Sequence, residues 1–259
     1  MKEIINLNEK AKTVRNEFEM ILPCLEESII MEPFYSDFQY KFCWNSNSLE
    51  GNTLTLDETI QLIEYDEVRS GHTYTEYEEA KRLYRAINDF LDYERNIIDE
   101  KWIKAVNDVI TGNMKPGYRK EDVYIGNKIE AVYYPPSHDT VEKHMKDFLE
   151  NINDIPSDME AMVKMAALKH IEFERIHPFV DGNGRSGRML LNQMLINGGL
   201  LPVVFDSNSQ YRQCFRRYDR NKDTSMLEYL IYKGEQEAID NLKVLKMKYV
   251  KSRKTVKIK

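Results

Sequence analysis

The sequence has little of what would mark a secreted, membrane-spanning or nucleic-acid-binding protein. Its three cysteines, Cys24, Cys43 and Cys214, are scattered and odd in number, so we interpret them as reduced thiols and not as a disulfide framework or metal site. No apolar run is long enough to cross a membrane, and the N-terminus lacks a signal-peptide pattern. The net charge of −6 gives no general reason to expect nucleic-acid binding. We therefore expect a cytoplasmic protein with no membrane partner.

What the sequence does contain is the pattern of a mostly helical protein. Of its 259 residues, 42% are hydrophobic and 31% are charged, which is enough apolar material for a core. One β-rich stretch, residues 123–134 around Gly126-Asn127, predicts a hairpin. Apolar side chains at helical spacing predict helices over residues 3–31 (kinked or divided at Pro23), 57–70, 76–98, 100–111, 140–152, 158–176, 186–196, 207–219 and 224–250.

Between two of these helices, residues 177–188 read His-Pro-Phe-Val-Asp-Gly-Asn-Gly-Arg-Ser-Gly-Arg. Unpaired backbone N–H groups at the start of the second helix, together with the positive end of its dipole, form an anion cradle. We expect Gly182 and Gly184 to adopt positive φ and to let a phosphate approach the backbone. Arg185 and Arg188 lie three apart and project toward the same ligand. A helix stop without chemistry would explain the glycines, but not two arginines beside a carboxylate.

The same stretch holds a candidate base and a candidate metal ligand. His177 precedes the cradle, and Asp181 lies inside it as a hard oxygen ligand. A base, an oxygen ligand and a polyphosphate seat within twelve residues predict metal-assisted phosphoryl or nucleotidyl transfer. A two-histidine metal site with His170 is the weaker interpretation, because no third ligand is nearby. We expect His170 to be a buried, hydrogen-bonded scaffold histidine.

Residues 177–188 resemble the signature of the Fic family, His-Pro-Phe-x-(Asp/Glu)-Gly-Asn-Gly-Arg-x-x-Arg, and match it at every specified position. The resemblance implies an all-α, Fic-type helical fold with one β-hairpin flap. It also implies a nucleotidyltransferase that moves AMP from ATP to a Tyr, Thr or Ser hydroxyl of a target protein and releases pyrophosphate. In this family pattern His177 is the general base and Asp181 holds Mg²⁺ or Mn²⁺. The residues that it implies for phosphate binding are Gly182, Asn183 (through its side-chain amide as well), Gly184, Arg185 and Arg188.

A second stretch, residues 45–52, has two interpretations. On physical grounds it is the end of a helix at Gly51 before a capping box, Thr55-Leu56-Asp57-Glu58, that opens the next helix. It also resembles the (Ser/Thr)-x-x-x-Glu-(Gly/Asn) inhibitory motif of Fic proteins, with Ser46 and Glu50 in the specified places. The resemblance implies that Glu50 pairs with Arg188 and blocks the γ-phosphate.

Such inhibition requires a strong pair between Glu50 and Arg188, and this in turn constrains where Glu50 can lie. Keeping the site closed about 99% of the time needs a preference of roughly 2.7 kcal/mol. A desolvated arginine–carboxylate pair can supply it, whereas an exposed pair usually cannot. We therefore expect Glu50 to be well buried, and Ser46 to position the glutamate end of the helix through its hydroxyl.

The hairpin and a distant asparagine complete the predicted site. Residues 117–135, which include Gly117-Tyr118-Arg119 and Pro135, resemble the flap that covers Fic active sites. The resemblance implies that Ile125, Gly126, Asn127 and Lys128 clamp target and nucleotide, with the strand edge pairing an extended target segment. A purely structural hairpin is the alternative. By its distance from the signature, Asn221 resembles the adenine-contacting asparagine of the family, although a helix-ending residue is an equally good interpretation. The two aromatics that often precede that asparagine are replaced here by Gln213 and Cys214.

The predicted layout is one compact domain with three parts. These are an N-terminal helical scaffold (1–39), a Fic-like core (40–225) and a C-terminal helix with a basic tail (226–259). Self-modification and a homo-oligomer stay open, while nucleic acid is a weak alternative partner for the tail. Three other functions stay open: phosphoryl transfer, removal of AMP with the help of Glu50, and a non-catalytic nucleotide-binding regulatory module.

Overall fold

The computed structural model describes residues 6–114, 116–126, 131–205 and 208–256. Within this part the predicted helical fold with one hairpin is confirmed. Strands β1 (Ile125–Gly126) and β2 (Ala131–Tyr133) pair antiparallel, with Ile125 opposite Tyr133 and an irregularity between Ile125 and Gly126. The helices are α1 (Leu7–Leu25), α2 (Ser28–Leu49), α3 (Leu56–Tyr65), α4 (Tyr74–Phe90), α5 (Glu100–Thr111), the short 3₁₀ helix η1 (His138–Thr140), α6 (Val141–Leu149), α7 (Met159–Ile176), α8 (Asn183–Asn197), α9 (Asn208–Asn221) and α10 (Ser225–Val256).

Local capping signals placed several helix ends where the sequence predicts them. The Thr55 hydroxyl accepts from the Glu58 N–H, and the Glu58 carboxylate accepts from the Thr55 N–H, which is the predicted capping box of α3. Helix α5 has the predicted bounds, with Asp99 accepting from the Trp102 N–H and Gly112 left-handed at its end. The predicted helix 57–70 is too long, because Asp66 adopts a left-handed conformation that ends α3 at Tyr65.

The N-terminal helices differ from the prediction in where the chain breaks. Helix α1 continues through Pro23 and ends two residues later at Leu25. Glu27 then adopts an extended backbone conformation, and α2 begins at Ser28. The predicted single segment 3–31 is therefore two helices. The second of them runs without a break to Leu49 and carries Ser46 in its last turn.

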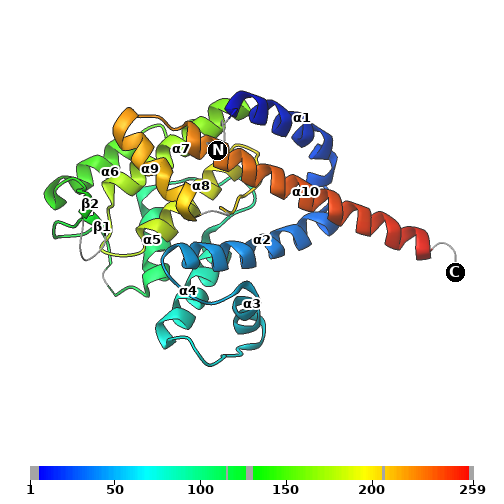
Figure 1. Cartoon of the computed structure of the whole chain (residues 1–259), viewed down its shortest axis with the longest axis horizontal. Coiled ribbons are helices and arrows are strands. Elements are labelled where there is room, and N and C mark those ends of the chain that lie inside the picture. The colour runs from blue at the N-terminus through cyan, green and yellow to red at the C-terminus, as the bar shows by residue number, and fades with distance from the viewer. Residues whose placement is uncertain (1–5, 115, 127–130, 206–207, 257–259) are drawn as a thin grey trace.

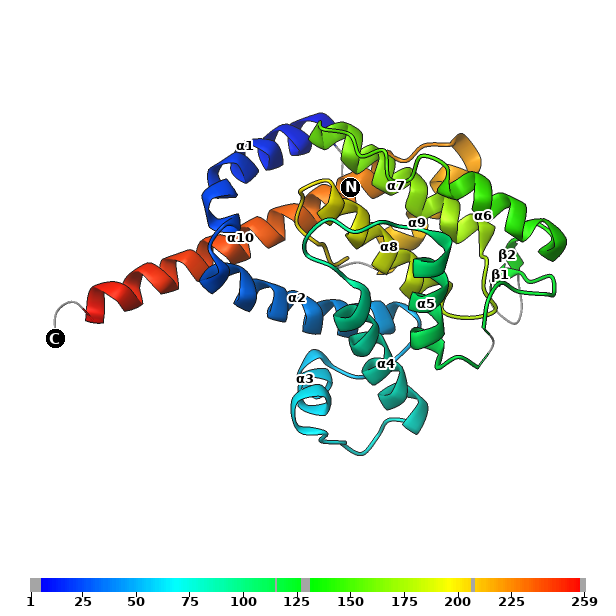
Figure 2. The ribbon, with the colours of Figure 1, turned by 180° about the vertical axis from the view of Figure 1, so that it is seen from behind.

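Helix α8 lies at the centre of the molecule, and every residue from Arg185 to Asn197 is buried. It packs against α7, α5 and α2, which come from three different parts of the chain (Figures 1 and 2). The start of α8 is therefore enclosed by elements that can present side chains to it from several directions.

Helix α10 is the longest helix of the described chain and runs beside α1 (Figure 1). Its final turns project beyond the other helices, and α10 also packs on α2 and α7. The hairpin lies beside α6, at the opposite end of the molecule from the C-terminus, in both views (Figures 1 and 2). Within the described residues, the structure contains no helix of the length and hydropathy that a bilayer crossing requires.

Candidate active site

The loop 177–182 joins α7 to α8, and a left-handed residue stands at each end of it. His177 has φ 49° and ψ 60°, and its N–H donates to the Phe173 carbonyl at 2.9 Å, which ends α7. Gly182 has φ 76° and precedes the first residue of α8. A Cβ at this glycine would lie 2.8 Å from Asn107 Nδ2, so both the backbone conformation and the space require glycine.

Helix α8 begins at Asn183, three residues earlier than the sequence predicts. The prediction of positive φ is correct for Gly182 and wrong for Gly184, which is helical. Gly184 is needed for space instead, because a Cβ there would overlap Glu50 Oε1 and lie 2.9 Å from Arg188 Nη1. The backbone N–H groups of the first helical turn, rather than of an open loop, form the anion cradle.

Side chains of three elements hold this loop in place. Asn183 clamps Phe179: its Nδ2 donates to the Phe179 carbonyl and its Oδ1 accepts from the Phe179 N–H, both at 2.9 Å. One N–H of the Asn183 amide is engaged in this clamp, and the predicted phosphate contact of Asn183 remains a prediction. Asn107 of α5 donates to the Asp181 carbonyl at 2.9 Å. Arg119 donates through Nε to the His177 carbonyl at 2.9 Å, and its N–H donates to the Pro178 carbonyl at 2.8 Å.

The sequence interpretation missed Asn107 and gave Arg119 no role of its own. A signal for Asn107 was present, because this amide falls on the apolar face of helix 100–111 between Ile103 and Ile110. Arg119 carried no comparable signal. Its partners are main-chain carbonyls, and those are invisible in a residue pattern.

His177 has the environment of a neutral base. Burial lowers its pKa to about 4, so the imidazole is uncharged near pH 7. Nδ1 lies 3.4 Å from the Glu174 carbonyl. A proton on Nδ1 leaves the lone pair of Nε2 available to accept another proton.

Asp181 lies at the open mouth of the cradle, with a side chain that is 66% exposed. One oxygen accepts from the Gly182 N–H at 2.6 Å, and the same oxygen lies 3.5 Å from Arg185 Nη2. No group of three or more His, Cys, Asp or Glu side chains surrounds a common point in the described chain. A lone carboxylate fits Mg²⁺ or Mn²⁺ that arrives on a polyphosphate, because such ions take most of their ligands from phosphate oxygens and water.

The guanidinium of Arg185 is buried, and two of its nitrogens form no hydrogen bond within the described residues. Its side chain is 4% exposed, and Nε and Nη1 form no hydrogen bond within the described part of the chain. Glu79 of α4 lies 3.5 Å from Nη1 and balances part of the charge. A buried guanidinium with two unpaired N–H groups at a helix start is costly unless an anion completes it. The site therefore fits a phosphate group.

Arg188 is held by Ser46 and Glu50, which arrive on the last turn of α2. Nε donates to Ser46 Oγ and Nη2 to the Ser46 carbonyl, both at 2.8 Å, while Nη2 also donates to Glu50 Oε1 at 2.7 Å. Burial opposes ionisation of Glu50, but the charge and hydrogen bond of Arg188 hold the pKa of this carboxyl below its usual value. The pKa of Arg188 is raised because burial is outweighed by Glu50.

Two details of this pair differ from the prediction. The Glu50 side chain remains 39% exposed and makes one contact with Arg188, so it is not well buried as predicted. Ser46 binds Arg188 directly instead of positioning the glutamate end of the helix. The reason is geometric: Glu50 is the C-cap of α2, at the solvent edge, while Ser46 lies one turn deeper.

Of the predicted flap residues, Ile125 and Gly126 form β1, whereas Asn127 and Lys128 lie outside the described residues. The base of the hairpin is fixed to the loop 177–182. Arg119, which binds the His177 carbonyl in that loop, also donates through Nη2 to the Pro136 carbonyl on the far side of the hairpin. Tyr133 of β2 packs on the Arg175 guanidinium at 4.4 Å, and Arg175 pairs with Asp219 of α9 at 2.6 Å.

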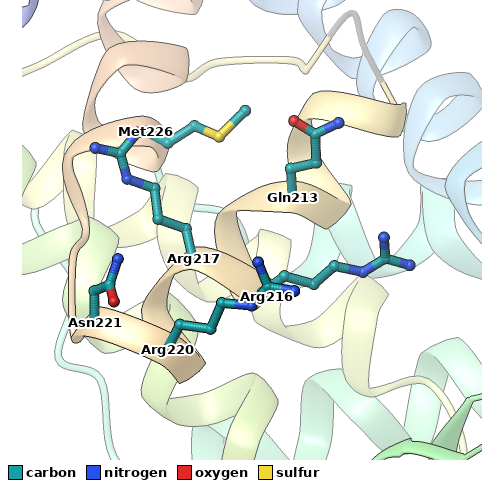
Figure 3. Close-up of a pocket in the computed structure, with 6 residues that line it drawn as sticks. All are labelled: Gln213, Arg216, Arg217, Arg220, Asn221 and Met226. Atoms are coloured by element: carbon teal, nitrogen blue, oxygen red, sulfur yellow. The ribbon is translucent and has the colours of Figure 1, made fainter.

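Asn221 is the last residue of α9 and lines a cavity of about 640 Å³ together with Gln213, Arg216, Arg217, Arg220 and Met226 (Figure 3). Figure 3 shows the Arg217 side chain extending toward Met226, while the side chains of Arg216 and Arg220 extend away from Met226. None of the six lining residues belongs to residues 177–188. The adenine contact of Asn221 therefore remains a prediction.

The expectation for His170 is confirmed. It is fully buried, with Nδ1 2.9 Å from the Gly187 carbonyl and Nε2 2.7 Å from the Tyr211 hydroxyl. Burial lowers its pKa to about 3, so it is a neutral part of the scaffold. Cys214, also buried, occupies one of the two positions where an aromatic was expected, and the buried Tyr211 packs against His170.

Comparison with known proteins supports the same grouping of residues. The Fic/DOC family profile matches residues 97–195, which contain α5, the hairpin, α7 and most of α8. A protein adenylyltransferase Fic of Nematostella vectensis is 28% identical over 184 residues, covering 68% of this chain and 42% of that protein. The Drosophila mojavensis protein of the same name is 30% identical over 189 residues, covering 66% of this chain and 35% of that protein. The chain thus spans less than half the length of these curated relatives.

Solved structures match the fold over nearly the whole chain. A Fic-domain-containing signaling protein of Bacteroides thetaiotaomicron superposes with a TM-score of 0.74 at 25% identity, covering 91% of this chain and 95% of that one. Residues 134–508 of Fic-1 from C. elegans superpose with a TM-score of 0.73 at 21% identity, covering 92% of this chain and 71% of that one. Residues 97–195 therefore form a Fic/DOC family domain.

Proposed function

We propose that the chain is a protein adenylyltransferase, which transfers AMP from ATP to a Tyr, Thr or Ser hydroxyl of a protein. The observation that carries the proposal is the buried Arg185 in the N-terminal turn of α8. Within the described residues its Nε and Nη1 form no hydrogen bond, and Nη1 has an ion-pair contact with Glu79 at 3.5 Å. Relatives that match two-thirds of this chain are named protein adenylyltransferases, which agrees with this chemistry.

In the proposed reaction His177 accepts the proton of the target hydroxyl. The hydroxyl oxygen forms a bond to the α-phosphorus, its proton moves to Nε2, and the bond between the α-phosphorus and the bridging oxygen breaks to release pyrophosphate. A neutral imidazole with its second nitrogen directed to the Glu174 carbonyl is prepared for this step. Positioned bases of this kind contribute a factor of about 10²–10⁴ in rate.

The negative charge of the triphosphate is met by the α8 N-terminus and two arginines. Arg185 would bind the phosphates through its unpaired donors, and Arg188 would bind the γ-phosphate. Asp181 is the residue that would hold Mg²⁺ or Mn²⁺, and the ion when bound neutralises phosphate charge and orients the oxygens.

Autoinhibition by Glu50 is part of the proposal. Glu50 and a γ-phosphate are both anions that need the same Arg188 donors, so they compete. The single contact between Arg188 and the partly exposed Glu50 contributes by itself less than the roughly 2.7 kcal/mol that a closed site requires. Ser46 supplies the remainder, because its two bonds hold Arg188 in the inhibited geometry.

We further propose that the hairpin presents the target. Arg119 ties both sides of the hairpin base to the carbonyls around His177, so an extended segment on this edge would place its hydroxyl at a fixed distance from the base. Exposed apolar side chains near it suit a protein partner, and they are Tyr124, Val132, Tyr134 and Val180.

Removal of AMP is a second candidate function. Its support is the ionised Glu50 carboxylate, which lies at the edge of the cradle against Gly184 and remains partly open to solvent. A carboxylate there can orient a water molecule toward a bound phosphorus.

Incubation of the Glu50→Gly variant with ATP labelled in either the α- or the γ-phosphate tests the proposal. Label on protein from the α-phosphate alone supports AMP transfer. Label from the γ-phosphate alone would indicate phosphorylation, and no label from either would indicate a nucleotide-binding module without transfer.

A further inference from the structure

Glu174 is a buried carboxyl for which the proposed reaction has no use. It lies in the last turn of α7, where the residue is 9% exposed, and Oε1 is fully buried without a hydrogen-bond partner in the described chain. Its carboxyl rests on α8 at Gly187, since a Cβ there would lie 2.6 Å from Glu174 Oε1. Gly187 immediately precedes Arg188, and the charge of Arg188 acts on this carboxyl as it does on that of Glu50, which comes from a different element.

Charged groups surround the Glu174 carboxyl, but its Oε1 accepts no hydrogen bond from the described residues. Two arginine charges favour its ionised form, and burial together with the Glu50 charge disfavours it. The balance raises its pKa to about 7, with burial as the largest cause. The titratable and charged groups around it are Arg188 of α8, Glu50 at the end of α2, Tyr211 of α9, and Arg175 and His170 of its own helix, of which Tyr211 and His170 are uncharged near pH 7.

We propose that Glu174 is a positioning residue for Arg188, and that it takes up a proton from solution when an anion binds to this arginine. The Glu50 carboxylate or a γ-phosphate on Arg188 favours the neutral form of Glu174, and Glu174 ionises more readily, as the replacement counter-charge, when Arg188 has no other anion. The inference rests on the proposed nucleotide site and adds a proton to its binding equilibrium.

The direction of the effect follows from charge alone. An anion on Arg188 makes a second negative charge at Glu174 less favourable, so the bound state holds the proton more tightly than the empty state. Nucleotide binding to an empty Arg188 therefore takes up a proton and weakens as the pH rises above neutrality. In the wild type one anion replaces another, so the same binding takes up little or none.

Proton uptake distinguishes the proposed role of Glu174 from a purely structural role. A packing residue would change stability or affinity equally at all pH values. A positioning residue of the proposed kind changes how affinity depends on pH. The carboxamide of Glu174→Gln has the shape of the neutral acid and cannot ionise, so it fixes the protonated form.

The test is calorimetric titration of ATP with Mg²⁺ into the Glu50→Gly, His177→Ala protein, which cannot turn over. Comparing buffers of different ionisation enthalpy at pH 7.5 gives the number of protons taken up. We expect uptake of a fraction of one proton per ATP, and a Kd that rises by about threefold between pH 6.5 and 8. With Glu174→Gln added, we expect ATP still to bind, with proton uptake near zero and a Kd that hardly changes over this range.

Each other result has a definite meaning. Equal proton uptake with and without Glu174→Gln overturns the role of Glu174 and leaves the nucleotide site intact. ATP binding without proton uptake in either protein does the same. An absence of ATP binding to both proteins, with cooperative thermal unfolding showing that they are folded, overturns the proposed nucleotide site itself. Wild-type protein with Glu50 in place should show less uptake than the variant that lacks it.

Discussion

Glu50 and Arg188 are 138 positions apart in the sequence, yet Nη2 of the arginine lies 2.7 Å from Oε1 of the glutamate. Two bonds of 2.8 Å from the same guanidinium to Ser46 accompany this contact. The last turn of α2 and the first turns of α8 are therefore joined through one buried side chain. Whatever moves the end of α2 also changes which donors of Arg188 are available.

Replacing Glu50 by glycine should raise self-modification, because it frees Arg188 for a γ-phosphate. Loss of a preference of roughly 2.7 kcal/mol corresponds to an increase of about a hundredfold. Transfer of α-labelled AMP onto the protein measures it. Glu26→Gly is the matched control, since Glu26 is the C-cap of α1 with φ −88° and ψ −7°, close to the −91° and 0° of Glu50. Equal activity in the wild type and Glu50→Gly would remove the autoinhibition claim.

Ser46→Ala should give a smaller activation than Glu50→Gly. The hydroxyl accepts from Arg188 Nε, and a hydrogen bond to a charged group is worth about 1.5–3 kcal/mol, while the Ser46 carbonyl bond and Glu50 remain. Labelled AMP transfer by the two single variants and the double variant measures the coupling. Additive effects would show that Ser46 acts independently of Glu50.

Gly184→Ala should destabilise the wild type more than the Glu50→Gly protein. In the wild type the new methyl group overlaps Glu50 Oε1, and overpacking costs about 1–3 kcal/mol. Without Glu50 that overlap is gone, the close approach to Arg188 Nη1 at 2.9 Å remains, and alanine within a helix gains roughly 0.5–1 kcal/mol over glycine. Urea unfolding of the four proteins measures the difference between the two backgrounds. The same shift in both backgrounds would show that Glu50 does not lie against Gly184.

The rate at saturating ATP should not fall as the pH drops from 7 to 5. The pKa of His177 is lowered to about 4, so the base stays neutral over this range and is lost only as the pH approaches 4. A histidine with its ordinary pKa near 6.5 would be half protonated at pH 6.5 and would lose more than about nine-tenths of the activity by pH 5. The pH profile of self-modification by Glu50→Gly, measured only where the protein is folded, distinguishes the two. An acid limb near 6.5 would contradict the burial of His177.

Arg119→Lys should lower the transfer rate far more than the affinity for ATP. A lysine cannot reproduce bonds to the carbonyls of His177, Glu121 and Pro136 at once, so the base and the hairpin lose their common support. Misplacement of a base by about 1 Å costs on the order of a hundredfold in rate. Comparing kcat with the Kd for ATP tests this, with the exposed Arg85→Lys as control. A parallel loss of both would indicate general unfolding.

Local signals account for what the sequence predicted well. The capping box at Thr55 and Glu58, the bounds of α5 and the scaffold role of His170 each depend on neighbours along the chain or on burial. The start of α8 was misplaced because the signature reads as a loop, whereas of Gly182 and Gly184 only Gly182 has positive φ, and Asn183 is already helical.

Other parts of the site depend on partners that no local pattern contains. Arg119 and Asn107 bind main-chain carbonyls 58 and 74 positions away. The motif indicated that Glu50 pairs with Arg188, but not that the hydroxyl and carbonyl of Ser46 both face the guanidinium. The raised pKa of Glu174 likewise arises from burial against Gly187, which is a tertiary contact.

The most direct test of the account is the intact mass of the Glu50→Gly protein after incubation with ATP and Mg²⁺, beside the same protein carrying His177→Ala. The account predicts that the first gains the mass of AMP on a hydroxyl side chain and that the second gains nothing. A gain of phosphate in place of AMP, or an unchanged mass in a folded protein that binds ATP, would contradict it.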